Sequence, residues 1–252
     1  MDRAGPAYWD AVWRASTPQP YPGPIFSGHR IYDRYLPHQT GLRFLEVGCV
    51  PGNLMVYFAK HFGYSVDGVD YSSGGSLVEA TLKLNDVPGR FFQADAFTFA
   101  PDHLYDVVFS QGFVEHFDDP VAPVRRHADL AKPGGLVVLA VPSITHFNLW
   151  AMRRYEPEAL ATHRFELMTP AGLEDASIKA GLATVFVGYE PVTFRLICGV
   201  GWWDLPVRAL RKGLALLGAD SVPNKWGSPY VMYIGRKPLV DVTSQITVAS
   251  SS

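Results

Sequence analysis

The sequence predicts an α/β protein with a doubly wound, mostly parallel sheet of seven strands. From Leu42 onward, short apolar runs alternate with segments of helical periodicity. Apolar runs between helices indicate strands that are buried on both faces of a sheet. The chain has 252 residues, of which 48% are apolar and 18% charged. This composition suits a compact protein with a large core and excludes a disordered chain.

Strands and helices are expected in regular alternation. The predicted strands are the runs RFLEVG (43–48), YSVDGVD (64–70), RFFQAD (90–95), YDVVFS (105–110), GLVVLAV (135–141), ATVFVGYE (183–190) and YVMYIGR (230–236). Helical patterns fall between them, and one helix is expected to begin at Thr169 and Pro170, a side-chain cap followed by proline in the first turn. The sequence therefore predicts alternating strands and helices in one doubly wound unit.

The organisation indicates one domain, residues 41–237, with additions at its edges. An aromatic helix and a strap rich in proline make up residues 1–40 and are expected to act as a lid. Insertions at 142–168 and 198–227 are expected to enclose an acceptor, and residues 238–252 read as a loose tail. In the second insertion, one helix carries Val207, Leu210, Leu214 and Leu217 on a single face. We favour a core-facing helix over one lying on a membrane surface.

Charge and composition exclude several classes of protein. Twenty-two basic residues against twenty-four acidic ones give a net charge of −2, so no basic field favours nucleic acid. Two cysteines do not make a disulfide framework. The charged start does not fit a signal peptide, and no apolar run is long enough for integral membrane association. We expect a cytoplasmic protein whose partner is a small molecule, and a homodimer is compatible with the sequence.

Polar and small residues follow the first three strands at the edge where a doubly wound sheet binds its ligands. Gly48 and Gly52 lie in the first strand-to-helix turn, where small residues let a ligand approach the backbone. Asp70 ends the second strand, where a carboxylate can accept both hydroxyls of a ribose. Asp95 ends the third strand and is placed to bind an adenine amino group. The alternative is that these carboxylates are ordinary loop or capping residues.

Five ordered motifs carry a family resemblance: LEVGCVPGNL, VDYS, QADAF, YDVVFSQGFVEHFDDP and LAKPGGLVVLAVPS. Together they resemble the class I S-adenosylmethionine (SAM)-dependent methyltransferases, in particular the small-molecule type 11, UbiE/UbiG-like group. The resemblance implies a Rossmann-like methyltransferase fold, with SAM as cofactor and S-adenosyl-L-homocysteine (SAH) as product. One position departs from the family, which usually has glycine where this chain has Val50. Either the Val50 side chain points away from the cofactor, or cofactor affinity is reduced.

The resemblance also implies roles for residues around the methionine part of the cofactor. Gly48 and Gly52 would line that part with their backbone, and Glu46 would hold its ammonium group directly or through water. Gln111, just past the fourth strand, would lie under the sulfonium.

At the nucleoside end, the resemblance assigns the ribose hydroxyls to Asp70, with Tyr71 beside the adenine. Asp95 would bind the adenine amino group, and the Ala96 backbone amide would contact the ring.

Methyl transfer to a hydroxyl also needs a base, for which histidine is suited by its ordinary pKa. His116 follows the fourth strand, His146 follows the fifth, and His163 precedes the next helix. We rank them in that order as bases, with a structural histidine that bonds the loop backbone as the alternative for His116. Glu115 is equally compatible with a structural and a catalytic role. The remaining histidines are interpreted as surface or packing residues: His29, His38, His61, His103 and His127.

Tryptophan is confined to the three segments expected to enclose the acceptor, at positions 9, 13, 150, 202, 203 and 226. We expect an apolar acceptor site that includes Trp13, Trp150, Trp202 and His163, whereas some of the tryptophans only fill gaps in packing. Asp118 and Asp119 before Pro120 favour a helix cap over a metal site, so no metal is expected.

These observations favour a SAM-dependent methyltransferase acting on a small apolar or aromatic acceptor, with O-methylation first and N- or C-methylation as alternatives. A non-catalytic cofactor-binding module stays open because Val50 departs from the pattern. An NAD-dependent oxidoreductase would share the sheet and Asp70, but GCVPG lacks the spaced glycine fingerprint of that class.

Overall fold

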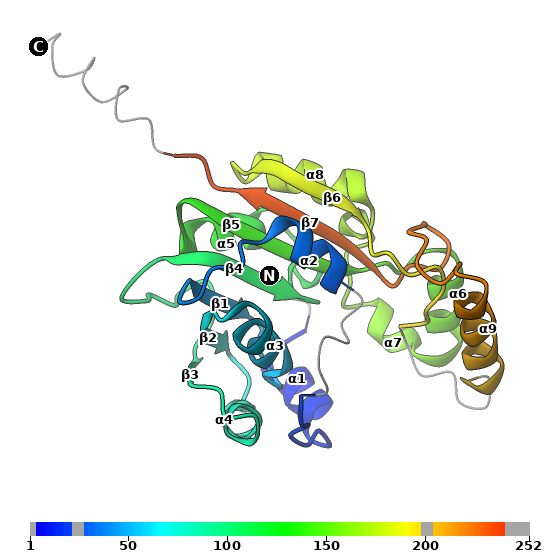
Figure 1. The fold of residues 1–252 in the computed structure, drawn as a ribbon, viewed down its shortest axis with the longest axis horizontal. Coiled ribbons are helices and arrows are strands. Elements are labelled where there is room, and N and C mark those ends of the chain that lie inside the picture. The colour runs from blue at the N-terminus through cyan, green and yellow to red at the C-terminus, as the bar shows by residue number, and fades with distance from the viewer. Residues whose placement is uncertain (1–3, 22–27, 198–203, 240–252) are drawn as a thin grey trace, which may run out of the picture.

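The computed structural model describes residues 4–21, 28–197 and 204–239, and its seven strands form one sheet in the order β3-β2-β1-β4-β5-β7-β6 (Figure 1). The strands are β1 (Arg43–Val47), β2 (Ser65–Asp70), β3 (Gly89–Gln93), β4 (Tyr105–Gln111), β5 (Ala131–Pro142), β6 (Ala183–Tyr189) and β7 (Tyr230–Arg236). All neighbours are parallel except β7, which runs antiparallel to β5 and β6. The predicted seven-stranded, mostly parallel sheet is confirmed.

Helices cover both faces of this sheet (Figure 1). The described helices are α1 (Pro6–Trp13), α2 (His29–Tyr35), α3 (Asn53–Phe62), α4 (Gly75–Leu84), α5 (Val121–Leu130), α6 (His146–Tyr155), α7 (Pro157–Leu160), α8 (Pro170–Lys179) and α9 (Asp204–Leu216), with short 3-10 turns at Val114–His116 and Phe165–Met168. One hydrophobic core contains α2, α3 and α4, and the other contains α5 and α8. The sheet therefore separates two cores.

Alternation along the central strands explains why their sequences are almost continuously apolar. In β4, Val107 and Phe109 belong to the core beneath α3, whereas Val108 belongs to the core beneath α5. In β1, Phe44 and Leu45 divide in the same way. Successive strand side chains point to opposite faces, so a strand covered on both sides needs apolar residues at every position.

The strand order reverses between β1 and β4, because the chain runs from β1 outward to β3 and then returns to the other side of β1. Ligands of doubly wound sheets bind beyond the carboxyl ends of the strands at such a reversal. The loops after β1, β2 and β4 meet there, so the fold places the predicted motifs at one edge.

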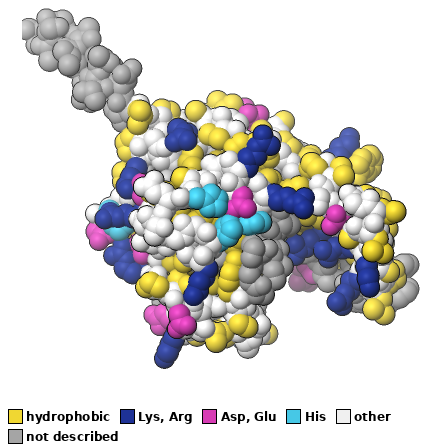
Figure 2. Space-filling view, viewed as in Figure 1, with side chains coloured by type: hydrophobic (Ala, Val, Ile, Leu, Met, Phe, Trp, Pro, Cys, Tyr) yellow, Lys and Arg dark blue, Asp and Glu magenta, His cyan; other side chains and the backbone are white. Residues whose placement is uncertain are grey.

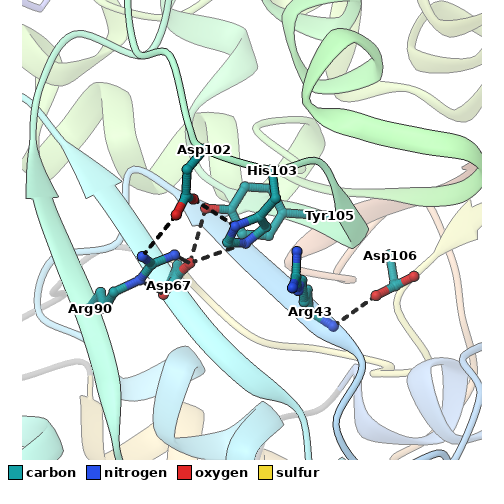
Figure 3. A network of polar contacts seen from close by, with 7 residues as sticks. All are labelled: Arg43, Asp67, Arg90, Asp102, His103, Tyr105 and Asp106. Carbon is teal, nitrogen blue, oxygen red and sulfur yellow. Dashed lines mark hydrogen bonds and ion pairs between the residues drawn. The ribbon is translucent and has the colours of Figure 1, made fainter.

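At the opposite edge, where the strands begin, acidic side chains are paired with basic and hydroxyl groups (Figure 3). Asp67 accepts hydrogen bonds from Arg90 Nε and Nη2, at 3.0 and 2.7 Å, and from the Tyr105 hydroxyl at 3.0 Å. Asp106 accepts from Lys132 Nζ at 2.7 Å and from the backbone amide of Arg43 at 2.9 Å. These partners compensate the burial of the carboxylates and tie β1, β2, β3 and β4 together.

The helix predicted in the second insertion forms as α9, but its apolar side chains do not pack as expected. Leu210 is 50% exposed, and Leu217, just beyond the helix, is 81% exposed. The expectation of a core-facing helix is therefore wrong for this part of the face, while Val207 and Leu214 are partly covered. Within the described ranges, no helix has both the length and the apolarity needed to cross a membrane.

Thr169 caps α8 as the sequence predicts, because its hydroxyl accepts a hydrogen bond from the Gly172 amide at 3.2 Å. We expect Thr169→Ala to lower the free energy of unfolding by about 1 kcal/mol, the usual value of a lost cap. Urea denaturation measures the change, and Thr169→Ser, which keeps a hydroxyl acceptor, serves as the matched control. Equal stability of the alanine variant and the wild type would contradict a stabilising cap.

Candidate cofactor and acceptor site

A cavity of about 490 Å³ lies beyond the carboxyl ends of β1, β2 and β4. The predicted site residues that line it are Trp13, Glu46, Gly48, Asp70, Tyr71, Ala96, Gln111, His116 and His163. Four other predicted residues lie outside its wall, namely Gly52, Asp95, His146 and Trp150, whereas Trp202 lies outside the described residues. The structure thus brings most of the predicted cofactor residues together with two of the three candidate bases.

The turn from β1 to α3 depends on two glycines with left-handed backbone, Gly48 at φ 74° and Gly52 at φ 92°. A Cβ on Gly48 would lie 3.1 Å from the Phe113 ring, and one on Gly52 would lie 3.3 Å from the Val78 side chain. Side chains are therefore disfavoured at both positions by conformation and by space. Gly48 keeps its backbone open to the cavity, and Gly52 lets α3 approach α4.

Val50, which stands where the family usually has glycine, packs toward α4. Its side chain is 4% exposed, and a Cβ built on Gly74 would lie 2.7 Å from Val50 Cγ1. The missing side chain at Gly74 provides the room that Val50 fills, while Val50 still forms part of the cavity wall. A large residue at position 50 is therefore accommodated by a glycine in the neighbouring loop.

Asp70 connects two loops of the site with one carboxylate. Its Oδ1 accepts a hydrogen bond from the Ser72 amide at 2.8 Å, and its Oδ2 accepts from the Val50 amide at 3.4 Å. Burial raises the pKa of Asp70, and the hydrogen bonds from Ser72 and Val50 oppose that shift. Each carboxylate oxygen accepts more than one hydrogen bond, so Asp70 can also receive the hydroxyls of a ribose.

Glu46 presents a buried and incompletely satisfied carboxylate at the end of β1. It is 4% exposed, and its Oε2 has no hydrogen-bond partner among the described residues. Burial raises the pKa of Glu46 well above its usual value, and the nearby Asp70 raises it further. A buried acceptor without a donor costs stability, and the ammonium group of an amino-acid moiety would supply both the donor and the compensating charge.

The cavity is bounded on one side by α1, which is attached to the loop after β2. The Asp10 carboxylate accepts from the Ser73 amide at 2.8 Å and from the Ser73 hydroxyl at 2.9 Å. Tyr71 donates its hydroxyl proton to the backbone just ahead of α1. Trp9 and Trp13 stack at 6.4 Å on this helix, and both line the cavity. The aromatic face expected for the N-terminal helix is therefore turned toward the site.

The two adenine residues of the sequence prediction are placed differently. Ala96 lines the cavity, whereas Asp95 is exposed and lies outside the cavity wall. Asp95 Oδ1 accepts a hydrogen bond from the Phe97 amide at 2.8 Å, which stabilises the turn after β3. The structural role that the sequence left open for Asp95 is present, and its adenine contact stays a prediction.

At the far end of β4, Gln111 lines the cavity, and its amide donates to the Tyr230 hydroxyl at 3.3 Å. This hydrogen bond orients the Gln111 side chain in the cavity wall, between the residues expected to bind the cofactor and those that follow β4.

Three titratable side chains, Glu115, His116 and His163, gather in the other half of the cavity. His116 Nδ1 donates to the Thr162 carbonyl at 2.9 Å, an arrangement that leaves the Nε2 lone pair available. That nitrogen lies 3.7 Å from Glu115 Oε1, and the rings of His116 and His163 are 4.6 Å apart. Ligand atoms of the three residues lie within 4.8 Å of one another, a spacing that could also hold a metal ion.

Burial drives the pKa values of this cluster in opposite directions. It raises the pKa of Glu115 to about 8, against the opposing effect of the backbone at Glu115 and Phe113. It lowers the pKa of His116 to about 4, and the neighbouring His163 lowers it further. Both shifts disfavour the charged form. Near pH 7, the carboxyl group therefore carries a proton and the imidazole is neutral.

The other candidates for the acceptor site lie elsewhere. His146, at the start of α6, packs its ring against Trp226 at 3.9 Å and does not line the cavity. Trp150 is 55% exposed and contacts Tyr155. Asp119 caps α5 through the Val121 amide at 2.9 Å, as the sequence favoured. Of the described tryptophans, only Trp9 and Trp13 line the cavity.

Residues 26–186 match a protein family described as a methyltransferase domain. The ubiquinone biosynthesis O-methyltransferase of Ruegeria pomeroyi is 35% identical over 157 residues, which are 58% of this chain and 62% of that protein. The 2-methyl-6-phytyl-1,4-hydroquinone methyltransferase of Synechocystis is 32% identical over 101 residues, 40% of this chain and 32% of that protein. Each match spans less than two thirds of the relative's length.

Solved structures show the same fold at low identity. A protein from the study "Conversion of a Disulfide Bond into a Thioacetal Group during Echinomycin Biosynthesis" aligns over 98% of both chains, with a TM-score of 0.63 and 17% identity. The [4+2]-cyclase SpnF aligns over 83% of this chain and 79% of its own, with a TM-score of 0.57 and 16% identity. Together with the match to the family, the fold places this chain in the class I SAM-dependent methyltransferases.

The raised pKa of Glu115 makes stability depend on pH. The folded state holds the Glu115 proton up to about pH 8, whereas the unfolded chain releases it near its ordinary value of 4.5. The stabilising contribution is therefore complete below pH 4.5 and is lost as the pH rises to about 8, by up to about 1.4 kcal/mol per pH unit. We expect Glu115→Gln, which cannot ionise, to become more stable relative to wild type between pH 5 and pH 8.

Urea denaturation at both pH values measures this difference. Glu166→Gln, which removes an exposed carboxylate paired with Arg164, is the control. A stability difference between Glu115→Gln and wild type that is the same at both pH values would show that Glu115 ionises normally in the folded protein.

Proposed function

We propose that this protein transfers a methyl group from SAM to a hydroxyl group of a small, apolar or aromatic acceptor. The observation that carries the proposal is a single cavity in which the acidic ends of β1 and β2 face one half and a buried neutral imidazole faces the other. An aromatic helix forms part of the wall of both halves. Such an arrangement holds a charged nucleoside cofactor beside an acceptor whose proton must be removed.

The residues of the first half fit the cofactor. The unpartnered Glu46 carboxylate would hold the ammonium group, the open backbone at Gly48 would lie along the methionine part, and Asp70 would take the ribose hydroxyls. Gln111 would lie at the junction with the acceptor half. Bound SAM supplies an electrophilic methyl group, activated by the positive sulfonium.

The residues of the second half support proton removal from the acceptor. The Thr162 carbonyl accepts from His116 Nδ1 and thereby directs the basic Nε2 of the neutral ring toward Glu115 and the cavity. An acceptor hydroxyl within hydrogen-bond reach of Nε2 would transfer its proton to His116 as the oxygen attacks. His163, whose ring centroid lies 4.6 Å from that of His116, is the second imidazole beside the proposed base.

Aromatic side chains support an apolar acceptor. Trp9 lies edge-on to the His116 ring at 5.0 Å between centroids, so the indole covers the candidate base. Ile144 and Met152 line the cavity together with Trp9 and Trp13. Two relatives are an O-methyltransferase of ubiquinone biosynthesis and a 2-methyl-6-phytyl-1,4-hydroquinone methyltransferase, which agrees with a phenolic hydroxyl as the acceptor group. Water exclusion by these residues would favour transfer to the acceptor over side reactions.

N- or C-methylation remains an alternative because proximity and orientation alone accelerate displacement at a sulfonium carbon. The likeness to a protein named as a [4+2]-cyclase also keeps open a cofactor-binding protein without methyl transfer. Conversion of a phenol to its methyl ether, with no turnover of the matching aniline, would separate O-methylation from both alternatives.

The cofactor half predicts a clear effect of Asp70→Ala. Loss of the carboxylate should weaken SAH binding by about 10- to 100-fold, because hydrogen bonds to charged groups are worth about 1.5–3 kcal/mol. Isothermal calorimetry measures the affinity. Asp102→Ala, an exposed carboxylate paired with His103 at the opposite edge, should bind SAH as the wild type does. Unchanged affinity of the Asp70 variant would remove Asp70 from the cofactor site.

The acceptor half predicts that His116→Ala lowers kcat by about 10²- to 10⁴-fold, the range that general bases contribute. SAH affinity should change little, because the imidazole lies in the other half of the cavity. His146→Ala is the matched control and should keep its activity, since His146 packs on Trp226 outside the cavity. Full activity of the His116 variant would show that this ring is structural.

A further inference from the structure

A second cluster of histidines lies on the surface formed by α2 and α3, away from the cofactor cavity. We propose that His29, Asp33, His38 and His61 form a binding site for a divalent transition-metal ion of the Zn²⁺ type. Figure 2 shows histidine side chains gathered around one acidic side chain on this face of the molecule. None of the four residues lines the cofactor cavity, so the proposed site is independent of methyl transfer.

All three imidazoles direct Nε2 at the same carboxylate. His29 Nε2 lies 2.9 Å from Asp33 Oδ2, and His61 Nε2 lies 2.6 Å from Asp33 Oδ1. His38 Nε2 lies 3.4 Å from Asp33 Oδ1. One ligand atom from each of His29, Asp33 and His61 falls within 4.8 Å of the other two. The cluster therefore offers two imidazole nitrogens and one carboxylate oxygen at metal-ligand spacing, with His38 Nε2 3.4 Å from the same carboxylate as the candidate fourth ligand.

This donor set matches the preference of a borderline divalent metal. Zn²⁺ is usually bound by four ligands in a tetrahedron, and imidazole nitrogen and carboxylate oxygen are among its common ligands. Mg²⁺ and Ca²⁺ prefer oxygen and would not select three imidazoles. The side chains of His29 and His61 are each 24% exposed and that of His38 is 51% exposed, so an ion can reach the ligands from solvent.

Tyr57 supplies the outer hydrogen bond that metal-binding histidines usually make. His29 Nδ1 lies 2.8 Å from the Tyr57 hydroxyl. If Nδ1 donates its proton to that oxygen, Nε2 keeps the lone pair that faces Asp33. The Tyr57 ring also stacks on His61 at 5.4 Å with an interplanar angle of 14°. One residue of α3 therefore orients two of the proposed ligands.

A metal at this position would link α2 and the residues just after it to α3, which packs in the core of the domain. His29 and Asp33 belong to α2, His38 follows that helix, and His61 lies in the last turn of α3. The first turn of α3 follows the glycine turn of the cofactor cavity. The expected role of the ion is therefore structural, and its signature is a gain in stability.

The test uses the full-length chain without a histidine tag, first stripped of metal and then titrated with Co²⁺, whose visible absorption bands report tetrahedral coordination. We expect the wild type to bind Co²⁺ with these bands and to exchange it for Zn²⁺. Asp33→Asn combined with His61→Gln should weaken Co²⁺ binding by more than about 100-fold, beyond the 10- to 100-fold effect of losing an outer partner. Tyr57→Phe, which keeps all four ligands, should weaken it by about 10-fold.

Two controls assign the metal to this cluster. Glu115→Gln combined with His163→Gln disables the cluster in the cofactor cavity and should keep the Co²⁺ spectrum. His103→Gln removes an imidazole paired with Asp102 elsewhere on the surface and should also keep it.

Thermal unfolding provides a second readout. Zn²⁺ at about a hundredfold excess over its Kd should raise the Tm of the wild type by about 5 °C or more, and this shift should vanish in the Asp33/His61 variant. The proposal is overturned if the wild type shows neither tetrahedral Co²⁺ bands nor a Zn²⁺-dependent Tm shift. It is also overturned if both signals persist in the Asp33/His61 variant or disappear only in the Glu115/His163 variant.

Discussion

The carboxylate of Asp70 is the interaction on which the candidate site depends. It accepts one hydrogen bond from the loop after β2 and another from the loop after β1, so a single side chain sets the distance between the two loops. The same two loops contain the glycine turn at Gly48 and Gly52 and the contact of Val50 with Gly74. The loop after β2 in turn carries Ser73, which anchors α1 beside the cavity. The loop after β2 therefore contacts both the loop after β1, through Asp70, and the aromatic helix α1, through Ser73.

The two edges of the sheet treat buried charge differently. Where the strands begin, Asp67 is satisfied by Arg90 and Tyr105, and the network serves the fold (Figure 3). Where the strands end, Glu46 and Glu115 are buried without full sets of donors, and their pKa values are raised. Unsatisfied buried carboxylates weaken a fold, and their concentration at one edge agrees with a site shaped for a ligand. The opposite shifts of Glu115 and His116 arise from the same burial, and they prepare a protonated acid beside a neutral base.

Periodicity made the fold predictable, and the polar residues Glu46, Asp70 and Gln111, expected at or next to the ends of β1, β2 and β4, all line the cavity. The acceptor half was less predictable, since the Thr162 carbonyl that orients His116 lies 46 residues away. His146 follows a strand as His116 does, yet its ring packs on Trp226. The histidine cluster around Asp33 was not predicted, because its residues are far apart in the sequence and come together only where α2 packs on α3. The exposed leucines of α9 likewise show that an amphipathic sequence predicts a helix but not which part of the protein packs on its apolar face.

We propose that the cofactor and the candidate base share one cavity. A crystal structure of the protein with bound SAH provides the test, because the open side of the thioether sulfur marks where the methyl group would be. We expect the ribose at Asp70, the amino-acid part near Glu46 and Gly48, and the open side of the sulfur facing His116 beneath Trp9. A cofactor bound with its sulfur facing away from His116, or bound outside this cavity, would show that the candidate base does not face the methyl group.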